Sequence, residues 1–247
     1  MNSATVRTLL VRGMLAGLGA GVLAFVFARF VGEGSVDAAI AFEESRSHEH
    51  GEELVGRSLQ STAGLATGVL VFGVAIGGIA ALAFCFALGR IGRFGARATA
   101  ALTALAGFLL VYLVPILKYP ANPPAVGDPD TIGRRTGLFV LMIALSVLLG
   151  TAAVLLGRRL APAWGNWNAS ITAGVAFVTV VGVAMAVLPP GDSIPAGFPA
   201  AGLWEFRMAS IGIEAVLWSA FGLLFGHLAE RVLEPGAVRG RVAGLAA

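Results

Sequence analysis

Six long apolar runs dominate the sequence and restrict what the chain can fold into. They cover residues 9–31, 64–88, 98–117, 136–157, 169–188 and 208–228. As helices, runs of about 20 residues cross a hydrocarbon core of about 30 Å. Lipid cannot satisfy exposed backbone N–H and C=O groups, so each run is expected to be helical. With 57% hydrophobic and 13% charged residues, the chain is predicted to be an all-α integral membrane protein with about six transmembrane helices.

The basic residues indicate how these helices are oriented. Ten Lys and Arg fall in the N-terminus, residues 89–97, residues 157–167 and the C-terminal tail, against seven in the other connections. Because Lys and Arg are enriched in cytoplasmic segments, we expect both termini in the cytoplasm and the 32–63 connection outside. The net charge of +3 is therefore interpreted as a topology signal and not as a sign of nucleic-acid binding. Because the sequence also has no RNA- or DNA-binding motif, we expect no nucleic-acid partner.

The expected domain organisation is simple. Residues 1–235 form a single polytopic membrane domain, within which 32–63 is an acidic outer loop, and 236–247 form a cytoplasmic tail. The helices can be grouped as three hairpins, because two of the outer connections are rich in proline and two of the helices that follow them end in arginine-containing segments. Such a pattern is typical of repeats in transporters, although any helix pair also needs a turn-rich loop and a basic end. Both interpretations stay open.

Glycines recur every four residues in several runs. The pairs and triplets are Gly13, Gly17 and Gly21; Gly64 and Gly68; Gly73 and Gly77; Gly222 and Gly226. At this spacing small residues share one helix face and let another helix approach closely. We therefore expect these faces to be helix-packing surfaces.

The outer loop contains an unusual acidic stretch, "FEESRSHEHGEE", at residues 42–53. Borderline divalent metals such as Co²⁺ bind imidazole nitrogen and carboxylate oxygen. Metal contact and a merely solvated loop both account for the stretch. Its candidate metal ligands are Glu43, Glu44, His48, Glu49 and His50.

A second set of candidates belongs to a transport pathway. Glu214 lies inside the last apolar run, and ionisable residues at such places are commonly functional, although Glu214 could instead pair with Arg207. The stiff, proline-rich connection after the third run offers oxygen donors and leads into a pair of arginines. The candidates in and after this connection are Asn122, Asp128, Arg134 and Arg135.

Catalytic motifs are missing from the sequence. It has no H-E-x-x-H, G-x-S-x-G or Walker A pattern, and these are the patterns that indicate a zinc protease, a serine hydrolase or a nucleotide-driven motor. We therefore do not expect an enzyme, and we expect no cofactor.

The segments "LVPILKYPANPPAVGDPDTIGRRTGLFVLMIALS" and "FRMASIGIEAVLWSAFGLLFGHLAERV", with the glycine-rich start, resemble the CbtA family of probable cobalt transporter subunits in its actinobacterial form. The resemblance covers residues 5–235. It implies uptake of Co²⁺ as a substrate across the bacterial plasma membrane, linked to cobalamin synthesis. It also implies a partner of the CbtB type, a small subunit with one helix and a histidine-rich end. The family is often described with five membrane segments, whereas six are expected here.

Our hypothesis is therefore a multi-pass membrane subunit, in contact with lipid, that moves Co²⁺ or a similar divalent ion inward. Two alternatives remain. One is a metal-binding membrane scaffold or sensor without transport, and the other is a transporter of a different small solute. An oligomer is compatible with each of them.

Overall fold

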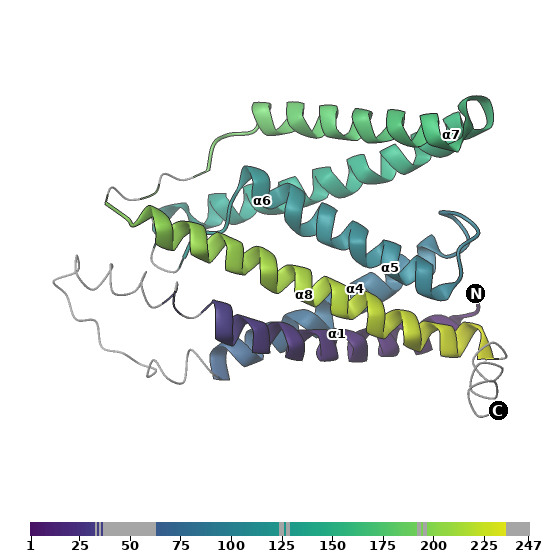
Figure 1. Ribbon diagram of the computed structural model, residues 1–247, viewed down its shortest axis with the longest axis horizontal. Helices are drawn as coiled ribbons and strands as arrows, with labels where there is room; N and C mark the ends of the chain where they lie inside the picture. The colour runs from purple at the N-terminus through teal and green to yellow at the C-terminus, as the bar shows by residue number, and fades with distance from the viewer. Residues whose placement is uncertain are drawn as a thin grey trace. The chain divides into compact units, whose positions relative to one another are not determined.

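The computed structural model describes residues 1–32, 63–123, 129–191 and 197–235, together with Gly34, Val36, Val126 and Ile194. Its elements, in chain order, are α1 (Ser3–Val31), α4 (Leu65–Ala87), α5 (Ala96–Gly107), a π-helical segment (Phe108–Leu113), α6 (Val114–Lys118), a 3₁₀ turn (Pro129–Thr131), α7 (Ile132–Val187) and α8 (Ala200–Leu233) (Figure 1). No strand occurs in the described residues, which confirms the all-α prediction.

The chain divides into two compact units. The first contains α1, α4, α5 and α8, and the second comprises residues 109–200. Each unit is described by itself below. Whether residues 1–235 act as one domain stays a prediction.

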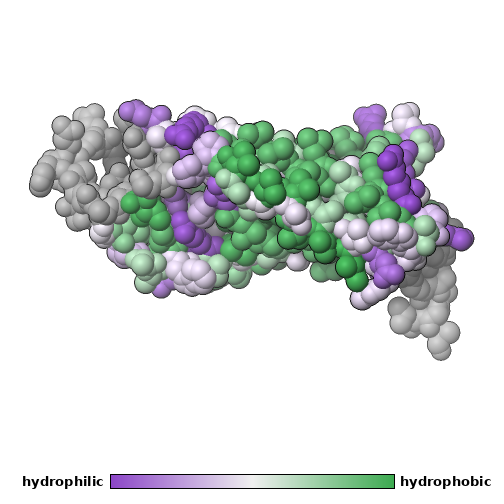
Figure 2. All heavy atoms as spheres, turned by 90° about the horizontal axis from the view of Figure 1, so that it is seen from above, coloured by the Kyte–Doolittle hydropathy of each residue, from purple (hydrophilic) through white to green (hydrophobic). Residues whose placement is uncertain are grey.

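Five helices in the described residues are long and apolar enough to cross a membrane: Ser3–Val31, Leu65–Ala87, Ala96–Lys118, Ile132–Val187 and Ala200–Leu233. The fourth is 56 residues long, but it merges two helices across a kink at Gly165. Figure 1 shows α7 turning back on itself. Its two arms contain the predicted runs 136–157 and 169–188, so the number of crossings agrees with the sequence-based count. Figure 2 shows apolar side chains over the middle of the visible surface and hydrophilic ones toward its ends.

The connection between those two runs corrects one prediction. Residues 157–167 were expected to form a cytoplasmic loop, but they are helical apart from the conformation of Gly165. Gly165 has φ 74° and ψ 159°, a region that is essentially restricted to glycine. The chain therefore reverses direction largely at one residue, and no long loop is needed.

Gly165→Ala is accordingly expected to destabilise the protein by about 1–3 kcal/mol, because alanine cannot adopt this conformation without strain. Thermal unfolding of the detergent-solubilised protein measures the effect. Gly174→Ala is the matched control, since a Cβ there would meet no atom within 4 Å and helical alanine is favoured over glycine. A Gly165→Ala protein as stable as the control would contradict the role given to this kink.

In the first unit, α1 and α4 pack with their backbones in contact. A Cβ placed on Gly13 would lie 2.6 Å from the carbonyl oxygen of Gly77, and one on Gly73 would lie 2.6 Å from that of Gly17. Glycine is therefore the only residue that fits at these positions. The packing role predicted for them is confirmed, whereas Gly68 faces open space and does not take part.

Helix α8 runs antiparallel to both α1 and α5. Against α5, a Cβ on Gly222 would lie 2.8 Å from that of Ala104, and one on Gly226 would lie 3.4 Å from that of Ala100. This regular ladder confirms the packing role predicted for Gly222 and Gly226. Phe225 extends the core by stacking on Phe221, at 5.2 Å between ring centroids.

In the second unit, a proline explains both an irregular stretch of helix and a hydrogen bond that a neighbouring helix donates to it. Pro115 has no N–H, which leaves a carbonyl about one turn earlier without its usual intrahelical donor. The π-helical segment Phe108–Leu113 precedes it, and the hydroxyl of Ser146 on α7 donates to the carbonyl of Leu110. Ser146 is fully buried. The hydroxyl thus satisfies a carbonyl that the proline would leave unpaired.

Candidate functional site

The predicted site residues fall in different parts of the chain. Asn122, Arg134 and Arg135 belong to the second unit and Glu214 to the first, so the structure describes them as separate groups. Six further candidates lie outside the described residues: Glu43, Glu44, His48, Glu49, His50 and Asp128. Their roles stay predictions.

The proline-rich connection of the second unit is held by a buried tyrosine. Tyr119 is 9% exposed, and its hydroxyl donates to the carbonyl of Pro189 at 3.0 Å. The backbone N–H of Val126 donates to the carbonyl of Pro123 at 3.2 Å. The hydrogen bond from Tyr119 therefore joins the start of the proline-rich connection before α7 to the start of the one after α7. Tyr119 also belongs to the core formed with Met142 and Val181.

The remaining candidates of this unit surround that corner. Asn122 is half-buried in the connection, and Arg134 and Arg135 lie in the first turn of α7, where Arg134 is exposed and Arg135 half-buried. A helix N-terminus carries a partial positive charge, to which two arginines add. The region therefore carries local positive charge, and the oxygen atoms that it offers to a cation among the described residues are those of the Asn122 amide and of the exposed Asp130 carboxylate, in the turn directly before α7.

Glu214 lies half-buried on α8, inside a membrane-spanning helix. Its carboxylate is hydrogen-bonded to the side chain of Trp218, one turn further along the helix. The indole of Trp218 in turn packs on Gly107 of α5, where an added Cβ would overlap the ring. Packing thus fixes the tryptophan that orients the carboxylate. Pairing of Glu214 with Arg207 stays a prediction.

An apolar groove of about 450 Å³ lies beside this position, between α5 and α8. Alanines, leucines and Trp218 line it, and its lining includes no ionisable side chain: Ala101, Ala104, Leu105, Phe108, Ala215, Trp218, Ser219, Gly222 and Leu223. It suits a hydrocarbon surface rather than an ion. Because the described lining of the groove offers no charged group, Glu214 is the anionic side chain beside it that could bind a cation.

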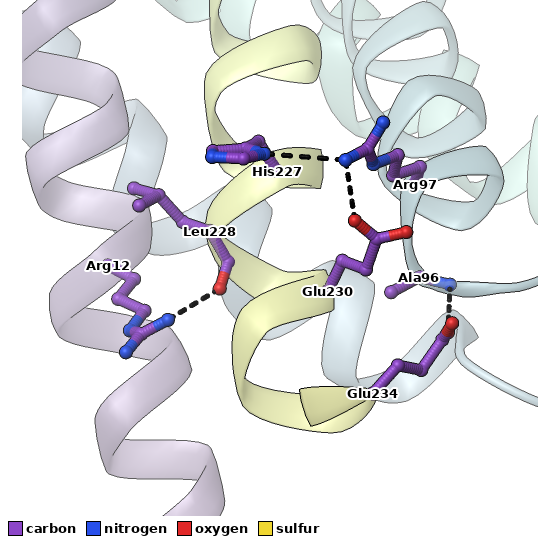
Figure 3. A network of polar contacts seen from close by, with 7 residues as sticks. All are labelled: Arg12, Ala96, Arg97, His227, Leu228, Glu230 and Glu234. Carbon is purple, nitrogen blue, oxygen red and sulfur yellow. Dashed lines mark hydrogen bonds and ion pairs between the residues drawn. The ribbon is translucent and has the colours of Figure 1, made fainter. Parts of the chain in front are cut away.

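A network of polar contacts, the α5–α8 polar cluster, lies at the C-terminal end of α8 (Figure 3). Arg97 Nη2 lies 2.6 Å from Glu230 Oε2 and 3.4 Å from His227 Nδ1. The backbone N–H of Ala96 donates to Glu234 Oε1 at 3.1 Å. Arg12 of α1 donates to the carbonyl of Leu228 at 2.7 Å. The cluster joins α1 and α5 to the last turns of α8.

Helix termini explain part of this arrangement. The N-cap of α5 is Gly95, whose position provides no side-chain hydrogen bond, so an N-terminal N–H of α5 needs another acceptor. Glu234 supplies it from a neighbouring helix and places negative charge at a helix N-terminus, where it is stabilising. Arg12 adds a donor to the carbonyl of Leu228 and places positive charge near the C-terminal end of α8, where it is favourable.

From the sequence, the arginines of this cluster were interpreted as topology signals, and their pairing was not predicted. The available signal was the spacing of His227, Glu230 and Glu234, which puts them on one face of a helix. Among the described residues, no group of three or more His, Cys, Asp and Glu side chains could hold a metal ion. A preformed, fully liganded metal centre is therefore not a property of this part of the chain.

The fold and these positions define a multi-pass helical membrane protein with few charged residues inside its spans. A family model described as "Probable cobalt transporter subunit (CbtA)" matches residues 6–230. The chain belongs to this family, and is thus a membrane transporter subunit for cobalt, as the resemblance indicated. No match was found among curated proteins or solved structures.

Proposed function

We propose that this subunit moves Co²⁺ inward across the bacterial plasma membrane, with Glu214 as the ion-binding group inside the membrane. The observation that supports this role is a half-buried carboxylate on a spanning helix, held in place by Trp218. An ionised group at such a depth costs several kcal/mol unless a partner or a cavity compensates it. A passing divalent cation is such a partner.

Orientation follows from the basic residues of the first unit. Arg12 and Arg97 lie together at the end of α8 that also carries Arg231 (Figures 1 and 3). By the positive-inside rule, we assign this end, and with it both termini, to the cytoplasm. The 32–63 loop is then outside, where Co²⁺ arrives. The membrane potential favours cation inflow by about 2.3 kcal/mol per charge per 100 mV.

The subunit is proposed to work with a partner and to supply cobalt for a biosynthetic use. The family description names a subunit, which supports a transport complex, and we propose a small histidine-rich membrane subunit of the CbtB type as the partner. Cobalt is the transported substrate and serves cobalamin synthesis, and the chain itself catalyses no chemical reaction. The direct test is uptake of radioactive Co²⁺ by cells expressing this chain, with and without the partner. Uptake equal to that of empty cells in both cases would contradict the proposal.

A separate prediction concerns the outer loop. Two histidines on a loop are expected to bind Co²⁺ weakly and to raise its local concentration, without selecting it. The double variant His48→Gln/His50→Gln is expected to lower Co²⁺ uptake a few-fold at limiting Co²⁺ and to leave it unchanged at saturating Co²⁺, since imidazole is a preferred ligand of this metal. Arg46→Gln, in the same loop, changes charge without removing a ligand and serves as the control. Equal uptake by the double variant and wild type at every concentration would show that the loop collects no metal.

A further inference from the structure

The two arms of α7 meet at Gly165 (Figure 1) and border an apolar groove of about 420 Å³ within the second unit. Leu149 of the first arm and Phe177 of the second form its floor, since both are half-buried and pack against the core of Met142 and Val181. Its described lining is apolar apart from one charged side chain, that of Arg159, near the reversal. The groove therefore has an apolar length and one basic end.

The length of the groove matches the depth of one bilayer leaflet. Its lining on the first arm runs from Leu149 to Arg159, a distance of about 15 Å at 1.5 Å per residue. A hydrocarbon core is about 30 Å thick, so one leaflet contributes about half of it. Trp164 and Trp167 are exposed beside Gly165, and tryptophans are enriched at the membrane–water interface. The Arg159 end thus lies near the headgroups and the Leu149 end near the middle of the bilayer.

The width of the groove distinguishes between a lipid chain and a further helix. A volume of about 420 Å³ over about 15 Å gives a mean cross-section of about 28 Å², whereas a helix about 10 Å across occupies about 80 Å². A hydrocarbon chain carries no side chains and fits the smaller width. The shape therefore favours one extended hydrocarbon chain.

The charge at the end of the groove indicates which headgroup such a chain carries. No hydrogen bond or ion pair joins Arg159 to another residue that the structure describes. Among the described residues of the second unit, the carboxylate present is Asp130, at the opposite end of the first arm. A guanidinium binds phosphate oxygens through paired hydrogen bonds, and basic pockets between membrane helices bind anionic headgroups. Arg159 thus complements the phosphate of a lipid whose chain lies in the groove.

We propose that the groove between the two arms of α7 is a binding site for one anionic phospholipid of the phosphatidylglycerol type. An acyl chain lies against Leu149 and Phe177, and the phosphate binds the guanidinium of Arg159. Because the lipid contacts both arms, it holds them together beside a reversal that depends on a single glycine. A ligand that binds only the folded state stabilises it by mass action, so the lipid is a structural ligand of this unit.

The first test is native mass spectrometry of the purified full-length protein in detergent, with equal amounts of phosphatidylglycerol and phosphatidylcholine. Wild type is expected to retain phosphatidylglycerol several-fold more often than phosphatidylcholine, and Arg159→Gln is expected to lose this preference. Arg158→Gln removes the same charge from the adjacent exposed position, outside the groove lining, and should keep it. Absence of the preference in wild type, its survival in Arg159→Gln, or its equal loss in both variants would overturn the site.

A second test addresses the acyl chain. Ala153→Phe places a ring in the groove and is expected to reduce retention of phosphatidylglycerol several-fold, whereas Ala144→Phe, at an exposed position of the same arm, leaves it unchanged. Undiminished retention by Ala153→Phe would contradict the proposal. Displacement of the lipid by an equal concentration of soluble glycerol phosphate would also contradict it, by showing that the position binds phosphate alone. A dimer that Ala153→Phe disrupts, with no lipid retained by wild type, would assign the groove to a second copy of the chain.

Discussion

Gly17→Val is expected to force α1 and α4 apart and to lower the free energy of unfolding by about 3 kcal/mol, at the upper end of the cost of overpacking. A Cβ on Gly17 would overlap the carbonyl oxygen of Gly73 and lie 2.9 Å from the Cα of Gly77. Both obstacles are backbone atoms of a helix, which cannot rotate away as a side chain can. Unfolding of the solubilised protein in mixed micelles, followed by circular dichroism, measures the loss.

The matched control is Gly68→Val on α4. A Cβ there meets no atom within 4 Å, and valine has a somewhat higher helix propensity than the glycine it replaces, so this variant is expected to be neutral or slightly more stable, by a few tenths of a kcal/mol. The control separates the packing effect from the general effect of replacing a helical glycine by valine. An equal loss of stability in the two variants would show that the close approach of α1 and α4 does not stabilise the protein.

The same glycines show what periodicity can predict. A spacing of four residues marks one face of a helix, and so it identified Gly13, Gly17, Gly73 and Gly77 as packing residues. It could not distinguish them from Gly68, because the spacing says nothing about whether another helix lies opposite. That depends on the register of two segments, which is determined by tertiary packing.

The reversal within α7 was harder to predict. Arg158, Arg159 and Pro162 are typical of a helix end followed by a loop, and they led to a predicted loop at 157–167. The structure instead continues the helix through Pro162 and reverses at Gly165. A proline disfavours a helix interior without forbidding it, and a glycine signals a sharp reversal only when its backbone conformation is known.

The polar cluster shows the opposite limitation. The pattern of basic residues placed Arg97 on the same side of the membrane as the C-terminal end of the last apolar run, but it did not predict that Arg97 pairs with Glu230 there. Their pairing depends on the antiparallel ladder of α5 and α8, in which Gly226 faces Ala100 one turn from the ion pair. Glu214, in contrast, could be singled out from sequence, because a carboxylate within an apolar run is informative without knowledge of its neighbours.

Glu214→Gln is expected to reduce the initial rate of Co²⁺ uptake about tenfold, which corresponds to a loss of about 1.4 kcal/mol in the interaction with the ion. Glutamine has nearly the same size and keeps an oxygen that accepts the hydrogen bond from Trp218. The packing of Trp218 on Gly107 is therefore retained, and only the negative charge is removed. Uptake is measured per amount of protein in the membrane, with the partner subunit present.

Glu205→Gln provides the control, since it is the same substitution on the same helix at an exposed position. A general effect of lost negative charge on α8 would lower uptake in both variants, whereas an ion-binding role lowers it only for Glu214. The alternative of a metal-binding scaffold or sensor without transport predicts Co²⁺ binding without Co²⁺ flux, and Glu214→Gln then changes nothing. Transport of a different solute predicts that excess Co²⁺ fails to compete with that solute. A Glu214→Gln protein that transports Co²⁺ as fast as Glu205→Gln would remove Glu214 from the pathway.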